Sequence, residues 1–214
     1  MHEPLSQRLA AILEGNAEPG PLTANRLMDL TEGRGGYLFM ILLSLPFVAW
    51  VSPPGLSTIL GTIITILGAR MAMERPPHLP ARYGDRPLPP RMMSLIRGSG
   101  LKFLRFLERG VRPRRTSWMS WRAVHTGNAL LVAFMAFLLA LPLPSPPFYG
   151  TNALPSYAIM LLAASMMEED GLLIWVGYAM SLGTCIYFAL WADVIVRHLP
   201  KWLHALRVLL EAGQ

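Results

Sequence analysis

The chain is poor in charge and in cysteine. Only 15% of its 214 residues are charged and 53% are apolar, whereas soluble domains carry about a quarter of charged residues. The mean hydropathy is +0.39, so the composition predicts a chain that uses lipid as its solvent. The single cysteine, Cys185, excludes an internal disulfide and any cysteine-ligated metal site. It lies in an apolar run, where it fits as a small packing residue.

Several short functional signatures are also missing. The sequence has no phosphate-binding loop of the Walker type, no dinucleotide-binding glycine fingerprint and no nucleophile elbow. Its five histidines lack the i, i+4 spacing of a helical metal site, so we predict no metal and no cofactor. Residues 1–35 hold five acids and no apolar core of the length that a cleavable signal peptide needs. These absences make an enzyme less expected without excluding one.

A proline-broken apolar pattern occurs twice. The first copy, residues 36–73, consists of two apolar arms joined at Ser52-Pro53-Pro54-Gly55. The second copy, residues 126–170, has two arms joined through residues 143–150, and in both copies a proline lies near the end of the first arm. Proline removes a backbone donor, so a broken helix in lipid needs other groups to satisfy its freed carbonyls. We predict an all-α integral membrane fold with two proline-broken helical-hairpin repeats.

The lengths of the apolar segments leave their topology open. A membrane span needs about 20 residues. The arms are shorter than this, so they are either short spans or re-entrant arms. Residues 171–192 form the longest apolar run and the best single spanning candidate. Small residues recur at helical spacing on two segments and predict faces for close helix packing; they are Ser57, Gly61, Thr65 and Gly68, and Gly177, Ser181 and Thr184.

Shorter helices are expected outside the apolar segments. Residues 5–13 place four apolar side chains on one helical face, and Thr23 is a plausible N-cap for a helix over residues 24–32. We expect both helices to lie at the interface or to pack on the membrane domain. The proline-rich residues 74–90 predict extended chain. Residues 92–110 alternate apolar and basic side chains, which is typical of a helix lying in the headgroup plane.

Positive charge is concentrated between the two hairpins. Residues 70–125 hold 13 Arg and Lys against three acids. Because this stretch lies between apolar segments, a cytoplasmic loop that attracts anionic lipid is favoured over a nucleic-acid site. If both hairpins return to the side from which they leave, residues 168–170 are cytoplasmic too. The last helix then exits outward, unless Gly183 breaks it and returns the chain.

These observations divide the chain into six parts. They are N-terminal amphipathic helices (1–35), a first membrane repeat (36–73), a basic cytoplasmic loop with an interfacial helix (74–125), a second membrane repeat (126–170), a last membrane helix (171–192) and an amphipathic tail (193–214).

Charged residues beside the apolar runs are the main candidates for chemistry. Glu168, Glu169 and Asp170 precede the last helix, where they cap its positive end or bind a proton, a cation or a basic partner. Arg70 ends the first repeat at the matching position, so a charge pair between Arg70 and Glu168 is one hypothesis. Arg34, in a Gly-Arg-Gly-Gly stretch, is either a positive-inside anchor or a contact for an anion such as a lipid phosphate.

Five motifs stand out along the chain: GRGGYLFMILLSLP (residues 33–46), PPGLSTILG (53–61), RPR (112–114), PLPSPPFYGTNALPSYAI (142–159) and EEDGLL (168–173). Taken together, they resemble the exopolysaccharide-synthesis ExoD family of bacterial inner-membrane proteins. The resemblance runs from about Leu5 to Leu199. It implies a multi-pass inner-membrane protein that takes part in making or exporting surface polysaccharide, and it carries over no catalytic residues. In the second repeat the family usually has a shorter turn, so Asn152 matches its asparagine only loosely.

We therefore expect a protein that moves or positions a lipid-linked or anionic intermediate of a surface polysaccharide. The alternatives are a membrane scaffold for polysaccharide-synthesis proteins and an enzyme that acts on polyprenyl-phosphate sugars. The expected partners are membrane lipids, polyprenyl-linked saccharide and polysaccharide-synthesis proteins, but not nucleic acid. The predicted substrate-binding residues are Arg34, Pro46, Pro53, Pro54, Gly55, Ser57, Pro142, Pro146, Pro147, Asn152 and Pro155, and the predicted coupling charges are Arg70, Glu168 and Asp170.

Overall fold

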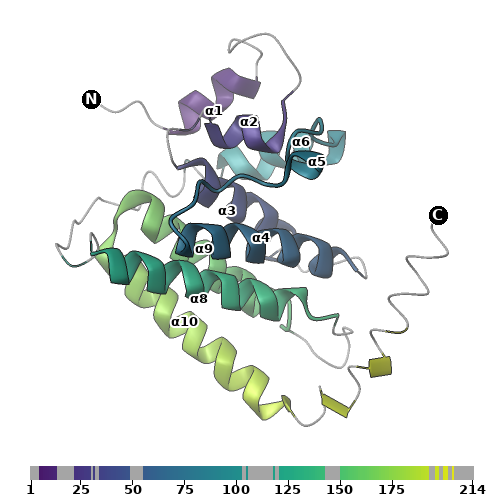
Figure 1. The fold of residues 1–214 in the computed structure, drawn as a ribbon, viewed down its shortest axis with the longest axis vertical. Helices are drawn as coiled ribbons and strands as arrows, with labels where there is room; N and C mark the ends of the chain where they lie inside the picture. Colours follow the sequence, from purple (N-terminus) through teal and green to yellow (C-terminus); the bar gives the residue numbers. More distant parts are fainter. Residues whose placement is uncertain are drawn as a thin grey trace.

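The structure is a computed structural model, and its described part is helical, without strands (Figure 1). It describes residues 5–13, 22–29, 31, 34–48, 55–102, 105, 118, 121–142, 150–192, 196–197, 200–201 and 204. The helices are α1 (Leu5–Leu13), α2 (Ala24–Asp29), α3 (Gly35–Val48), α4 (Leu56–Ala72), α5 (Ala81–Gly84), α6 (Pro90–Leu95), the π-helical η1 (Ile96–Gly100), α8 (Arg122–Ala140), α9 (Ala153–Glu168) and α10 (Gly171–Leu190).

Five of these helices form a bundle, and the short helices gather on one side of it (Figure 1). In the bundle α4 lies along α8, and α9 packs against both α3 and α10. α3 also contacts α2 and η1. Because α3 has neighbours on several sides, all of its residues from 35 to 44 are buried. The apolar helix α3 is thus enclosed by protein.

Within the residues that the structure describes, two helices, α8 and α10, are long and apolar enough to cross a membrane. Along α10 the exposed side chains are all apolar, and its large ones are more than half exposed: Leu172, Trp175, Val176, Leu182, Ile186 and Leu190. Apolar surface of this extent is unfavourable in water and favourable in lipid. The two helices and these exposed side chains indicate a membrane protein. α10 continues through Gly183, so the break considered at that position is absent.

The faces of small residues predicted from the sequence are packing faces. Gly61 of α4 lies against the backbone of α8, since a Cβ placed there would be 2.7 Å from the Ala140 nitrogen. About two turns further along α4, Gly68 lies in the same way against Ala133 of α8. On α10, Gly177 faces Leu162 of α9, and the predicted neighbours Ser181 and Thr184 are buried. Close backbone approach of this kind is how membrane helices associate.

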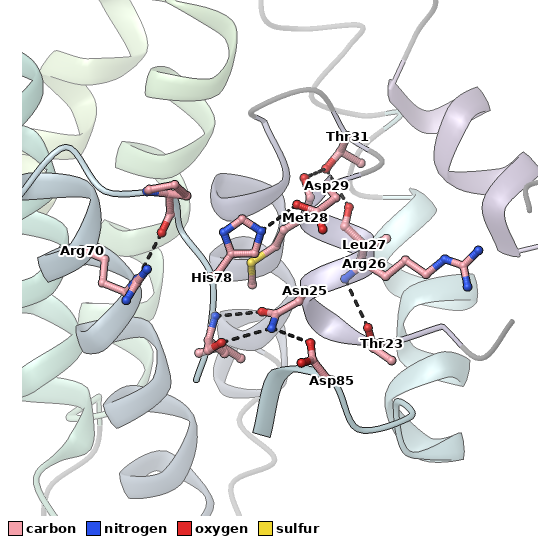
Figure 2. A network of polar contacts seen from close by, with 12 residues as sticks. Thr23, Asn25, Arg26, Leu27, Met28, Asp29, Thr31, Arg70, His78 and Asp85 are labelled. Atoms are coloured by element: carbon pink, nitrogen blue, oxygen red, sulfur yellow. Dashed lines mark hydrogen bonds and ion pairs between the residues drawn. The ribbon is translucent and has the colours of Figure 1, made fainter. Parts of the chain in front are cut away.

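The short helices form what we call the cap, the described residues within 5–31 and 75–105. The side chain of Asn25 joins its two parts (Figure 2). Asn25 Nδ2 donates to the Leu79 carbonyl at 3.1 Å and to Asp85 Oδ1 at 2.8 Å, and Asn25 Oδ1 accepts from the Leu79 N–H at 2.8 Å. Asn25 is 9% exposed, so these bonds satisfy backbone groups that would otherwise be buried without partners.

Replacing Asn25 by alanine is expected to destabilise the cap by about 1–3 kcal/mol, because it leaves the Leu79 N–H and C=O unpaired. Asn25→Asp should cost more, since it places a second carboxylate beside Asp85. Thermal unfolding of the detergent-solubilised protein measures both changes. Asp29→Asn is the control, because it removes only the ion pair between Asp29 and His78, whose side chains are 61% and 38% exposed, and such pairs contribute little. An Asn25→Ala protein as stable as the control would contradict this role.

Several predicted boundaries can be compared with the structure. The helix over residues 5–13 is confirmed, and the Thr23 Oγ1 accepts from the Arg26 N–H at 3.2 Å, as an N-cap does. The expectation of extended chain over residues 74–90 is wrong at α5, where four residues form a helical turn. α8 begins at Arg122, before the expected apolar arm. The Pro53-Pro54 and Pro146-Pro147 turns and most of the tail lie outside the described residues.

Candidate functional site

Polar contacts between helix ends bring both hairpins to one end of the bundle, which we call the charged end. Arg34, just before α3, lies with Nη1 3.6 Å from Oε1 of Glu168, the last residue of α9. One turn into α3, the Tyr37 hydroxyl is 2.7 Å from Nε2 of His125 on the first turn of α8. α3 and α8 therefore begin where α9 ends.

A third contact joins α4 to α8 at the same end. Arg122, the first residue of α8, donates from Nε and Nη2 to the two carboxylate oxygens of Glu74, two residues after α4. Glu74 has a positive φ of 54°, a backbone conformation that is uncommon outside glycine. The hydrogen bonds from Arg122 lower the pKa of the Glu74 carboxyl below its usual value. The guanidinium of Arg122 is thus held by a two-point contact with one carboxylate.

The lowered pKa of Glu74 predicts an acid-sensitive link between α4 and α8. A carboxyl with a lowered folded-state pKa stabilises the fold above its unfolded pKa, and this contribution is lost as the pH falls through the folded pKa. We therefore expect Glu74→Gln to lower the melting temperature at about pH 7, and this effect to diminish as the pH falls below the unfolded carboxyl pKa of about 4.3. Arg122→Gln and the double variant complete the test. The pH dependence should vanish when either partner is absent, and its persistence in Arg122→Gln would contradict the pairing.

Arg34 is held much more loosely than Arg122. Within the part of the chain that the structure describes, the Arg34 side chain makes no hydrogen bond, and its contact with Glu168 is an ion pair at 3.6 Å. The Arg34 side chain is 41% exposed, and that of Glu168 is 17% exposed. A guanidinium has five N–H donors in one plane. Arg34 therefore keeps donors available for a further partner at the start of α3.

Asp170 caps the last helix. Its Oδ1 accepts from the N–H groups of Leu172 and Leu173 at 2.9 and 3.3 Å, and the residue is 6% exposed. The interpretation of this acidic stretch as a helix cap is therefore confirmed for Asp170. Ser165 fixes the same corner by donating from Oγ to the Asp170 carbonyl at 2.8 Å. A role of Asp170 as a coupling charge stays a prediction.

The hypothetical charge pair between Arg70 and Glu168 is not formed. Arg70 Nε donates instead to the Pro76 carbonyl at 3.1 Å, just past the end of its own helix (Figure 2). Glu168 pairs with Arg34. A pair between the hairpins does exist at this position, but its cation comes from the start of the first arm. Packing of α9 against α3 is the reason.

The predicted site residues fall into two groups at opposite ends of the helices. Arg34, Arg70, Glu168 and Asp170 belong to the charged end. The described members of the other group end the first arms or begin the second: Pro46, Gly55, Ser57, Pro142, Asn152 and Pro155. Twelve helical residues at about 1.5 Å each separate Arg34 from Pro46, roughly 18 Å. One phosphate group cannot contact both ends, so the role of the proline-lined end stays a separate prediction.

Sequence reasoning assigned no role to three polar side chains of the helix interfaces. Tyr37 and His125 pair between α3 and α8. Asn128, 5% exposed on α8, accepts a hydrogen bond from the Tyr178 hydroxyl of α10 at 2.5 Å. The available signal was their position, since His125 and Asn128 lie one turn apart next to an apolar run, where a polar side chain needs a partner.

Comparisons with known proteins agree with the resemblance seen in the sequence. The family model described as "Exopolysaccharide synthesis, ExoD" matches residues 5–190. The protein named "Protein ExoD" from Rhizobium meliloti is 32% identical over 85% of this chain and 73% of its own length. An uncharacterized protein of Synechocystis is 27% identical over 68% of this chain and 66% of its own length. No solved structure matches the chain significantly.

Proposed function

The chain belongs to the ExoD family of exopolysaccharide synthesis, and we propose that within this synthesis it holds a lipid-linked anionic intermediate at the charged end of its membrane helices. The family supports a role in exopolysaccharide synthesis. The finer assignment depends on the residues at the charged end. Positioning of an intermediate, with or without its movement across the bilayer, is the function that these residues support best.

The loosely held guanidinium of Arg34 carries the proposal. Arg122 donates two hydrogen bonds to Glu74. Arg34, by contrast, has an ion pair with Glu168 at 3.6 Å and no side-chain hydrogen bond within the described residues. Arginine recognises phosphate through two parallel N–H···O bonds. Arg34 also precedes α3, whose first N–H groups point toward the same end and favour an anion. A phosphate or diphosphate group fits these donors better than a neutral sugar does.

Glu168 supplies the matching counter-charge. When no anion is bound, its carboxylate keeps Arg34 at the end of α3. A phosphate competes with it, because phosphate offers more charge and better geometry for a guanidinium. The polyprenyl chain of such an intermediate stays in the surrounding lipid, where the exposed apolar side chains of α8 and α10 also lie. Recognition at the headgroup, with the chain left in lipid, requires no enclosed cavity.

The proposal is tested by measuring secreted polysaccharide and lipid-linked sugar precursors in cells with and without the gene. A protein that positions the intermediate should, when absent, lower the polymer while precursor accumulates. Loss of polymer without precursor would contradict the proposal, because it places the step upstream and favours a scaffold or an enzyme. No change in either quantity would contradict any role of this protein in forming the polymer.

A further inference from the structure

The segment between α4 and α8 is tied to the charged end at both of its ends. Glu74 follows α4 and accepts two hydrogen bonds from Arg122, which opens α8. Trp121, directly before α8, is 64% exposed, in the position where tryptophan anchors a helix at a membrane interface. Because α8 is long and apolar enough to cross a membrane, the two ends of this segment are juxtamembrane.

The two described acids of the cap, Asp29 and Asp85, each have a side-chain partner within it. Asp29 Oδ1 lies 2.7 Å from Nε2 of His78, and Asp85 accepts from Asn25 (Figure 2). Many cations of the segment, by contrast, are exposed. Four of them make no side-chain hydrogen bond or ion pair with the described residues; they are Arg75, Arg86, Lys102 and Arg105. Within the described residues, these four exposed cations therefore have no acidic side chain paired with them.

The apolar side of residues 92–110 is used within the protein, as far as the structure describes this stretch. Ile96 is 0% exposed and belongs to the hydrophobic core, and η1, which contains it, contacts α3. Leu101 packs partly buried against the same core, while Lys102 and Arg105 are exposed. Ile96 and Leu101 therefore pack within the protein and are not available to enter lipid. Among the described side chains of this stretch, attraction to a membrane depends on the exposed cations.

From these observations we infer that the cap binds anionic phospholipid headgroups through Arg75, Arg86, Lys102 and Arg105, by electrostatic attraction without insertion of apolar side chains. Clusters of juxtamembrane Lys and Arg attract anionic lipid in this way. The proposal concerns a surface of the cap and does not depend on the function proposed for Arg34. It predicts a preference for anionic lipid that is lost at high salt, because screening shortens the range of charge interactions from about 10 Å at 0.1 M to about 3 Å at 1 M.

The experiment compares phosphatidylglycerol with phosphatidylcholine on the full-length protein in detergent, with native mass spectrometry giving the dissociation constant of each lipid. The test variant replaces all four cations: Arg75→Gln, Arg86→Gln, Lys102→Gln and Arg105→Gln. The control keeps the charge at the three arginines: Arg75→Lys, Arg86→Lys and Arg105→Lys. One juxtamembrane cation is worth about fivefold in association, so the test variant should bind phosphatidylglycerol at least about tenfold more weakly. The control should bind it as the wild type does.

Three results would overturn the inference. The first is equal affinity of the wild type for the two lipids. The second is unchanged phosphatidylglycerol binding by the glutamine variant, with circular dichroism showing that it is folded. The third is binding that survives 1 M salt, which would indicate insertion of apolar side chains. If the glutamine variant instead loses an acidic protein partner while its lipid binding is unchanged, this surface serves that partner and the inference is wrong.

Discussion

Replacing Arg34 by glutamine is expected to lower secreted polysaccharide at least about tenfold and to make lipid-linked precursor accumulate. A hydrogen bond to a charged group contributes about 1.5–3 kcal/mol, which corresponds to roughly a tenfold to hundredfold loss of affinity. Glutamine keeps much of the length of the side chain but has neither the charge nor the planar set of donors. Arg34→Lys should retain part of the output, because lysine provides the charge without the paired geometry. Both quantities are measured in cells that carry each variant on a deleted background.

Glu168→Gln separates ligand binding from a structural salt bridge. If Arg34 only stabilises the fold through Glu168, which lies 3.6 Å away, the two single variants should have equal effects and the double variant no more. If Arg34 holds the intermediate, Arg34→Gln should lower secreted polysaccharide much more than Glu168→Gln does. Arg197→Gln, an exposed cation after α10, controls for a general loss of charge. Severe loss with Glu168→Gln and none with Arg34→Gln would contradict anion binding and favour a coupling charge.

Replacing Gly61 by leucine is expected to prevent the close packing of α4 on α8. A Cβ at this position would lie 2.7 Å from the Ala140 nitrogen and 2.9 Å from the Ala136 carbonyl oxygen. Both are backbone atoms, so the clash can be relieved only by moving the helices apart. Overpacking of a close contact destabilises a protein by about 1–3 kcal/mol and at times more. We expect the destabilisation by leucine at this backbone contact to lie at the upper end of that range. We expect low yields and a lowered melting temperature in detergent.

A second glycine serves as the control for this change. Gly183 of α10 is exposed, and an added Cβ would meet nothing within 4 Å. Gly183→Leu should therefore fold with nearly the wild-type yield and melting temperature. Equal behaviour of the two variants would contradict the packing account. Gly68→Leu should lower the yield and the melting temperature more than Gly183→Leu does, because its Cβ would lie 3.0 Å from the Ala133 nitrogen.

The polar contacts of the charged end mark the limit of prediction from the sequence. Arg34 and Glu168 were both candidates, but the matching position of Arg70 suggested the wrong partner for Glu168. In the structure, α9 packs on α3, so the start of α3 meets the end of α9. Pairing across 134 positions of the chain, between Arg34 and Glu168, is decided by which helices are neighbours. Periodicity and spacing describe one helix at a time and carry no information on that choice.

The start of α8 illustrates the same limit on a smaller scale. Arg122 and His125 precede the second membrane repeat predicted over residues 126–170, and Asn128 interrupts its apolar pattern. All three have partners on other helices: Glu74 after α4, Tyr37 on α3 and Tyr178 on α10. Once these contacts satisfy the polar side chains, the helix extends to 19 residues and becomes long enough to cross a membrane.

The sequence by itself determined that the chain is helical and apolar, that it belongs to the ExoD family and that small residues line its packing faces. These properties depend on composition, on helical periodicity and on motifs, all of which are local. The tertiary structure decided that α3 is enclosed, that Asn25 joins the two parts of the cap, and that Arg34 meets Glu168 while Pro46, Pro142 and Pro155 lie at the other end. Each of these facts is a choice of partner between distant segments, and the packing of the whole chain makes that choice.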